Sequence, residues 1–226
     1  CQGRLPLTPI KDSVRPRSFP YVNIALILLN ILVFGYQLTL NPAALRELYT
    51  SLGVVPARLG LFDETLITAT FLHGGWAHII GNMLYLWVFG DNVEDRLGHA
   101  RYLFFYLLAG VAANFGHALA NPLSQIPTIG ASGAVAGVLG AYFLLFPRAR
   151  VLALVPLGFF LQLAEVPAVV FLFLWFALQL LNGVANLGAP NTMAQGIAWW
   201  SHISGFATGF LFIALLARDA LQRNRR

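Results

Sequence analysis

The sequence predicts an all-α membrane protein built as a bundle of six transmembrane helices. Of its 226 residues, 58% are hydrophobic and 10% are charged, whereas an average soluble domain is about 45–50% apolar and about 25% charged. Apolar stretches long enough to cross or nearly cross a bilayer follow one another along the chain. They are residues 21–40, 77–92, 102–120, 130–147, 166–187 and 198–217.

The basic residues indicate how these spans are oriented. With six spans, both termini lie on one side of the membrane, together with the second and fourth loops. That side then holds all fourteen Lys and Arg residues except Arg46 and Arg58. Because Lys and Arg mark the cytoplasmic side, we expect both termini in the cytoplasm. Residues 1–18 form a cytoplasmic N-terminal segment, residues 19–217 one six-helix domain, and residues 218–226 a basic cytoplasmic tail.

Three connecting segments need separate interpretation. Residues 41–69 are too long for a plain connector, so we expect a structured loop with short helices. Residues 91–101, which include His99, are read as a solvated cytoplasmic loop with local ion pairs. Residues 151–163 are apolar but shorter than the roughly 17–25 residues of a span, and Pro156 and Gly158 interrupt them. We expect this stretch to lie at the cytoplasmic interface.

Polar side chains occur at the start of three spans that all begin at the outer face. They are His78 and Asn82, Ser132, and His202. At about 1.5 Å per residue, each lies within roughly 10 Å of the outer boundary. Polar groups inside a bilayer are costly and usually face a cavity or mark a functional site. Glycines in the fourth and sixth spans allow these helices to approach closely, so we expect Ser132 and His202 to meet.

This set of residues suits hydrolysis by a serine nucleophile. A histidine base activates such a serine, and a carboxylate often orients the histidine. None of the nine acidic residues lies in the outer half of a span, so the sequence predicts a Ser132–His202 dyad. Candidate donors to an oxyanion are His78, Asn82 and the backbone N–H of Ser132. We expect no metal and no cofactor, because a His-Glu-x-x-His pair is missing, and read His73 as support for the first loop.

The chain resembles the rhomboid family of intramembrane serine proteases. The resemblance runs from about Ser18 to Ala217 and rests on three motifs in order: His78-Ile-Ile-Gly-Asn82, Gly130-Ala131-Ser132-Gly133, and His202-Ile-Ser-Gly205 followed by Gly209. It implies a rhomboid-like bundle around a cavity open to the outer side.

The same resemblance implies the activity and its residues. The expected reaction is cleavage of transmembrane segments of other membrane proteins, with Ser132 as nucleophile, His202 as general base, and His78 with Asn82 stabilising the oxyanion. Substrates would enter beside the second and fifth spans, which makes residues 171–176 a gate candidate. The expected partners are transmembrane protein substrates and the lipid bilayer, with no nucleic acid and no metal. The expected location is a bacterial cytoplasmic membrane.

Two positions depart from the pattern of some members. Glu64-Thr65 stands where they carry a Trp-Arg pair, and Ala136 stands where they carry a tyrosine that packs on the catalytic histidine. Another side chain must therefore hold His202, and Trp199 and Tyr142 are the candidates.

Other interpretations remain open at this point. Rhomboid-like proteins without the dyad act as membrane chaperones or dislocation factors, whereas this chain retains both dyad residues. A small transporter is disfavoured because inverted repeats and acidic sites within the spans are missing. The single cysteine, Cys1, excludes a disulfide framework. A first residue that is Cys suggests a processed or truncated start, and a lipoprotein start conflicts with a cytoplasmic N-terminus. His117 is read as structural.

Overall fold

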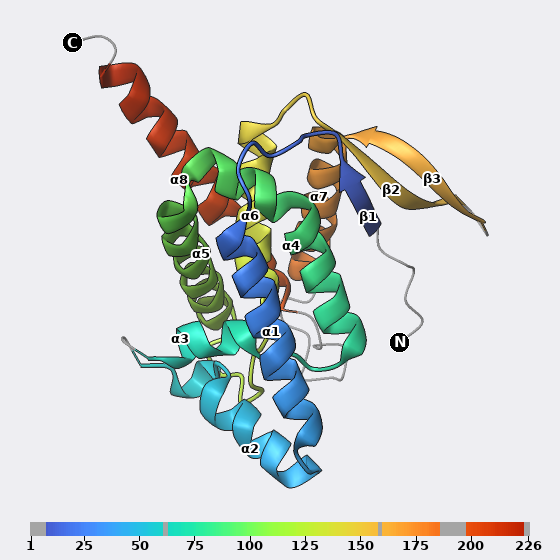
Figure 1. Ribbon diagram of the computed structural model, residues 1–226. Coiled ribbons are helices and arrows are strands. Elements are labelled where there is room, and N and C mark those ends of the chain that lie inside the picture. Colours follow the sequence, from blue (N-terminus) through green and yellow to red (C-terminus); the bar gives the residue numbers. More distant parts are fainter. Residues whose placement is uncertain (1–7, 61–62, 158–159, 186–197, 224–226) are drawn as a thin grey trace.

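The computed structural model describes residues 8–60, 63–157, 160–185 and 198–223 (Figure 1). Over these residues, long helices occupy the six predicted places: α1 (Tyr21–Thr39), α4 (Trp76–Leu97), α5 (His99–Ala120), α6 (Ser132–Leu145), α7 (Ala168–Ala185) and α8 (Trp199–Arg223). Helix α6 packs against α4, α5, α7 and α8 and forms the centre of the bundle. The predicted helical membrane bundle is confirmed.

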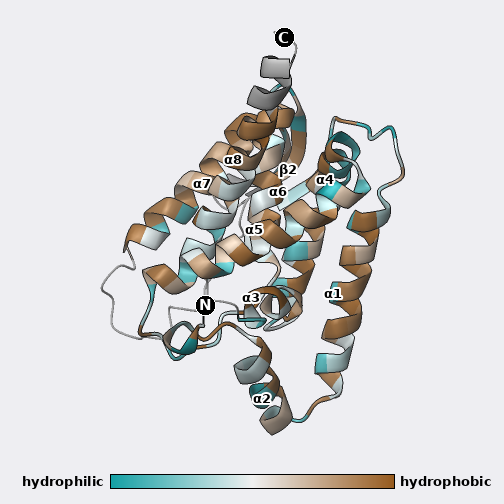
Figure 2. Cartoon of the chain, turned by 90° about the vertical axis from the view of Figure 1, so that its left-hand side faces the viewer, coloured by the Kyte–Doolittle hydropathy of each residue, from teal (hydrophilic) through white to brown (hydrophobic). Residues whose placement is uncertain are grey.

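The membrane-spanning character differs among these helices. Within the described residues, α1, α5, α7 and residues Trp199–Leu216 of α8 are long and apolar enough to cross a membrane. Helix α6 is apolar but only 14 residues long, and α4 carries charged residues in its last turns. Figure 2 shows hydrophobic residues along α1, α7 and α8. These features indicate an integral membrane protein, while the count of six spans stays a prediction.

The first connecting segment is structured, as the sequence predicted. It contains α2 (Pro42–Leu52), α3 (Thr65–Thr68) and the 3₁₀ turns η1 (Pro56–Arg58) and η2 (Ala69–Phe71). Helix α2 starts because the Asn41 side chain accepts hydrogen bonds from the N–H groups of Ala43 and Ala44, and Pro42 occupies the first helical position, where its missing N–H costs nothing. This segment lies at the end of the bundle where α6 begins (Figure 1).

Helix α6 is central because its small residues let other helices touch its backbone. Every residue from Gly133 to Tyr142 is buried. A β-carbon on Gly209 of α8 would overlap the carbonyl oxygen of Gly137, and one on Gly205 would overlap that of Gly133. Close contact between α6 and α8, predicted from these glycines, is therefore present along two turns of each helix.

The expectation of a solvated loop at residues 91–101 is wrong. Helix α4 continues to Leu97 and α5 begins at His99, with only Gly98 between them. The Glu94 side chain is fully buried. It accepts hydrogen bonds from the N–H groups of Val22 (3.0 Å) and Asn23 (2.7 Å) and pairs with His99. The cause is the N-terminus of α1, whose unpaired N–H groups and helix dipole favour a carboxylate.

The structure also contains a small sheet that the all-α expectation missed. Strands β1 (Thr8–Asp12), β2 (Arg150–Leu157) and β3 (Phe160–Pro167) form an antiparallel sheet in the order β1-β2-β3 (Figure 1). The apolar stretch 151–163 is thus part of a hairpin and not a seventh helix. It is too short for a span, and strand pairing satisfies its backbone polar groups instead. Residues 8–12, predicted to lie outside the domain, supply the third strand.

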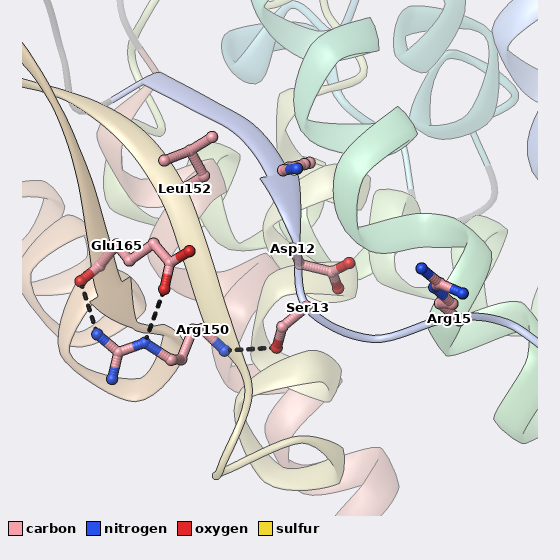
Figure 3. Close-up of a pocket in the computed structure, with 7 residues that line it drawn as sticks. Asp12, Ser13, Arg15, Arg150, Leu152 and Glu165 are labelled. Carbon is pink, nitrogen blue, oxygen red and sulfur yellow. Dashed lines mark hydrogen bonds and ion pairs between the residues drawn. The ribbon is translucent and has the colours of Figure 1, made fainter.

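A surface pocket of about 350 Å³ lies between β1 and the hairpin (Figure 3). Its lining is mostly polar, and Arg150 pairs there with Glu165 at 3.3 Å. Beside it, Asp12 accepts hydrogen bonds from the Tyr142 hydroxyl and the Asn92 amide. Tyr142 lies ten residues beyond Ser132 in α6, about 15 Å along the helix axis. The pocket therefore lies far from the predicted serine site.

Candidate active site

Ser132 is the first residue of α6, and the first loop holds the chain just before it. Gly130 has a φ of 128°, which side-chain-bearing residues rarely adopt. Its N–H donates to the carbonyl of Ala69 at 2.9 Å, and Val54 pairs with Thr128 through two backbone hydrogen bonds. Among the residues that the structure describes, no side chain caps the N-terminus of α6. The N–H groups of its first turn, starting at Ser132, therefore remain for another acceptor.

His78, in the first turn of α4, lies beside Ser132. A β-carbon on Gly130 would lie 2.5 Å from Nε2 of His78 and 3.7 Å from Oγ of Ser132, so both polar atoms face the same backbone position. On the other side of the ring, Nδ1 of His78 accepts a hydrogen bond from the N–H of Gly74 at 3.4 Å. An accepting Nδ1 places the proton of a neutral ring on Nε2. His78 thus presents a donor toward Ser132.

Asn82 lies one turn further along α4 and is buried. Its Nδ2 lies 3.1 Å from Nε2 of His73. An amide nitrogen can only donate, so Nε2 of His73 accepts, and the second N–H of Asn82 remains for another partner. Burial lowers the pKa of His73 to about 4, which keeps the ring neutral and able to accept at pH 7.

His73 connects this part of the site to the first loop. Its ring is fully buried and lies edge-on to the ring of His78, with centroids 5.1 Å apart. The backbone N–H of His73 donates to Oε1 of Gln37 at 3.0 Å, and its carbonyl accepts from Gln37 at 2.7 Å and from the Tyr49 hydroxyl at 2.9 Å. His73 therefore supports the first loop, as expected, and also holds Asn82.

His202 lies in the first turn of α8, on the helix that touches α6. A β-carbon on Gly133 would lie 2.5 Å from Oγ of Ser201, so the two helices meet one residue from Ser132 and one residue from His202. No hydrogen bond among the described residues joins Ser132 to His202. Hydrogen bonds between catalytic groups are often long in free enzymes and tighten with substrate.

Two tryptophan rings lie next to the imidazole ring of His202. The rings of Trp175 and Trp199 lie 5.8 and 6.3 Å away between centroids, so the expectation for Trp199 is met. The expectation for Tyr142 is wrong, because its ring packs against Phe89 and Phe146 at the far end of α6. Tyr142 lies ten residues beyond Ser132 in α6, about 15 Å along the helix axis, and its hydroxyl donates to Asp12 of β1.

Sequence reasoning missed Gln179. Its Oε1 lies 2.8 Å from Nδ1 of His202, and the side chain is only 8% exposed. The signal was available, since an amide in an otherwise apolar span marks a cavity or a functional site. Its partner could not be named, because that depends on how α7 packs against α8.

The remaining candidates fall around this centre. Phe171 is fully buried, and Phe176 packs on Phe206 with centroids 4.6 Å apart. Phe171 packs against Tyr85 and Phe89 of α4, and Phe206 belongs to α8, so the gate candidate 171–176 contacts both helices. His117 of α5 follows Gly116, the residue at which α5 meets Ser204 of α8. Within the described ranges, no group of three His, Cys, Asp or Glu side chains could hold a metal ion.

Comparisons with known proteins agree with the motifs. The family model described as the Rhomboid domain matches residues 64–219. The putative rhomboid protease YdcA of Bacillus subtilis is 38% identical over 77 residues, which cover 34% of this chain and 38% of that protein. RHOMBOID-like protein 4 of Arabidopsis thaliana is 33% identical over 192 residues, 81% of this chain and 43% of that protein.

A third relative comes from an organelle. Rhomboid-like protein 11, chloroplastic, of Arabidopsis thaliana is 28% identical over 155 residues, 67% of this chain and 52% of that protein. The chain therefore spans about half or less of the length of these relatives. The family model, which matches more than half of the chain, shows that this protein belongs to the rhomboid family.

Proposed function

We propose that this protein is an intramembrane serine endopeptidase that uses a Ser132–His202 dyad. The observation that carries the proposal is the position of Ser132 at the uncapped start of α6. There His78 lies beside the serine, and α8 touches the next residue of α6, Gly133. Nucleophile, base and oxyanion donors are the parts that acyl transfer requires.

The proposed reaction follows from the positions of the protons. Nε2 of His202 takes the proton from the Ser132 hydroxyl as Oγ attacks the carbonyl carbon of the scissile peptide bond. The resulting oxyanion accepts hydrogen bonds from Nε2–H of His78, from the second N–H of Asn82 and from the backbone N–H of Ser132. His202 then protonates the leaving amine, and water hydrolyses the acyl-enzyme by the same route.

The proposed substrates are transmembrane segments of other membrane proteins, which enter beside α4 and α7. Support comes from the apolar helices that surround the site and from a relative that is named as a putative rhomboid protease. We propose six spans with both termini in the cytoplasm and a bacterial cytoplasmic membrane as the location. A relative named for the chloroplast shows that the family is not confined to bacteria.

The test is labelling of the full chain in detergent micelles with a fluorophosphonate probe, together with cleavage of a membrane reporter substrate. Ser132→Ala and His202→Ala should each lower cleavage by roughly 10⁴–10⁶-fold and abolish labelling. Ser204→Ala is the matched control, because Ser204 is a serine two residues after His202 in α8, but its side chain faces Gly116 of α5. Cleavage by Ser132→Ala protein refutes the dyad. A folded wild-type protein that neither labels nor cleaves favours the non-proteolytic chaperone or dislocation factor.

A further inference from the structure

The position of Gln179 points to a role in the dyad that the family motifs do not supply. Helix α7 is apolar around it, with leucines on both sides at Leu178 and Leu180. A buried amide in such a helix is costly unless its polar atoms are hydrogen-bonded. Its carbonyl oxygen, Oε1, meets Nδ1 of His202 at 2.8 Å. This contact joins α7 to the proposed base on α8.

The chemistry of the contact determines which ring nitrogen carries the proton. A carbonyl oxygen only accepts hydrogen bonds, so Nδ1 of His202 must be the donor. In a neutral imidazole, the other nitrogen, Nε2, then has a free lone pair on the opposite edge of the ring. That nitrogen is the one that the proposed reaction uses as a base. Loss of the Oε1 contact would allow the proton to move to Nε2 and block proton uptake.

The face of α7 that carries Gln179 is built for this contact. Trp175, Gln179 and Gly183 are spaced four residues apart and therefore lie on one side of the helix. Trp175 packs on the ring of His202, with centroids 5.8 Å apart. A β-carbon on Gly183 would lie 3.0 Å from Cδ1 of Ile203, so the glycine permits α7 to approach α8. On this face of α7, Trp175 therefore packs on the His202 ring, Gln179 accepts the hydrogen bond from Nδ1, and Gly183 allows the close approach of α8 that both contacts need.

We propose that Gln179 is a positioning residue that takes the place of the missing carboxylate of a catalytic triad. It holds His202 as the Nδ1–H tautomer, with Nε2 directed to Ser132. A neutral amide does this without burying an additional charge, whose desolvation would be costly in an apolar bundle. The inference rests on the proposed Ser132–His202 dyad and goes beyond it by assigning the third member.

The first experiment reads the tautomer without any need for activity. Ser132→Ala protein, labelled with nitrogen-15 at its five histidines, is compared with the same protein carrying Gln179→Met. Methionine has a similar length but no strong acceptor. We expect the His202 signals to change from the Nδ1–H to the Nε2–H pattern. Asn182→Leu is the matched control, since Asn182 is an amide on the same helix that donates to the carbonyl of Leu178.

The second experiment measures the rate of fluorophosphonate labelling against pH in micelles. Gln179→Met should label about tenfold more slowly, the scale of one orienting hydrogen bond. Gln179→Glu keeps an acceptor and restores labelling, and its carboxylate stabilises the imidazolium, so the acid limb moves to higher pH by about one unit. The titratable groups near His202, namely His78 of α4 and His117 of α5, are the same in every variant.

The outcomes separate the two proposals. If Gln179→Met changes neither the tautomer nor the rate while the wild type labels, the positioning role is refuted and the dyad stands. If the tautomer of His202 depends on Gln179 but neither the wild type nor any variant is labelled or cleaves the reporter, the positioning role stands and the protease proposal is refuted. If Gln179→Met does not fold, the Gln179→Glu profile decides, because an unshifted acid limb contradicts the contact.

Discussion

The contact between α6 and α8 can be tested by a single added methyl group. Gly209 of α8 faces Gly137 of α6, and a β-carbon there would overlap the carbonyl oxygen of Gly137. It would also lie 2.7 Å from the carbonyl carbon and 2.9 Å from Cα of the same residue. All of these atoms belong to the backbone and cannot rotate away. Gly209→Ala therefore forces the two helices apart by more than about 1 Å at this level.

The expected magnitudes follow from that displacement. Overpacking of a core costs about 1–3 kcal/mol, which lowers Tm by about 2–12 °C for a chain of this size. Ser132 and His202 lie on the two helices that separate. A misplacement of about 1 Å between reacting groups can lower the rate by about 10²-fold. We therefore expect Gly209→Ala to fold with a reduced Tm and to lose cleavage by about that factor.

Thermal unfolding in micelles and cleavage of the reporter substrate measure both effects. Gly35→Ala of α1 is the matched control, because a β-carbon at that position would meet no atom of the described residues within 4 Å beyond its chain neighbours and the backbone of its own helix. Alanine is favoured over glycine in an exposed helix by about 1 kcal/mol, so Tm should stay the same or rise while cleavage is unchanged. If Gly209→Ala matches the Gly35→Ala protein in both measurements, the packing argument fails.

Three further predictions concern the oxyanion donor, the α1 cap and a buried histidine. Asn82→Ala should lower cleavage by about 10²–10³-fold, as for removal of one oxyanion donor; unchanged kinetics would remove Asn82 from the site. Glu94→Ala should lower the free energy of unfolding by about 2–4 kcal/mol, because a buried carboxylate that accepts two N–H groups is lost, and an unchanged Tm would contradict this. Burial lowers the pKa of His73 from 6.5 to about 4. Between these values the unfolded chain binds a proton that the folded chain does not, so stability falls as the pH drops from 6.5 to 4. The slope of Tm against pH in this range should be smaller in His73→Gln than in the wild type, and equal slopes in the two proteins would refute this contribution of His73.

The helices could be predicted from the sequence because their lengths and composition depend on local pattern. Apolar stretches of near-bilayer length predicted the six long helices of the described residues. The length of the first connecting segment predicted the short helices within it. The caps and strands could not be predicted in this way. Glu94 meets the N-terminus of α1 more than seventy residues earlier, and β1 pairs with a strand some 140 residues later. A charged residue near a span is read as solvated unless such a distant partner is known.

The candidate site shows the same division between local pattern and packing. Ser132, His202, His78 and Asn82 could be singled out because they are polar residues near the start of apolar stretches and belong to the three motifs of the resemblance. The absence of a carboxylate was also visible, since it depends only on which residues occupy the outer half of each span. The group that replaces the carboxylate depends instead on the rotation of α7 against α8. Trp175, Gln179 and Gly183, spaced four residues apart, fix that rotation together. Trp175 packs on the His202 ring, Gln179 accepts its hydrogen bond, and Gly183 leaves room for Ile203 of α8. A neutral partner for a buried histidine base can therefore be sought in a sequence as an amide residue that has an aromatic residue four positions before it and a glycine four positions after it on the same helical face.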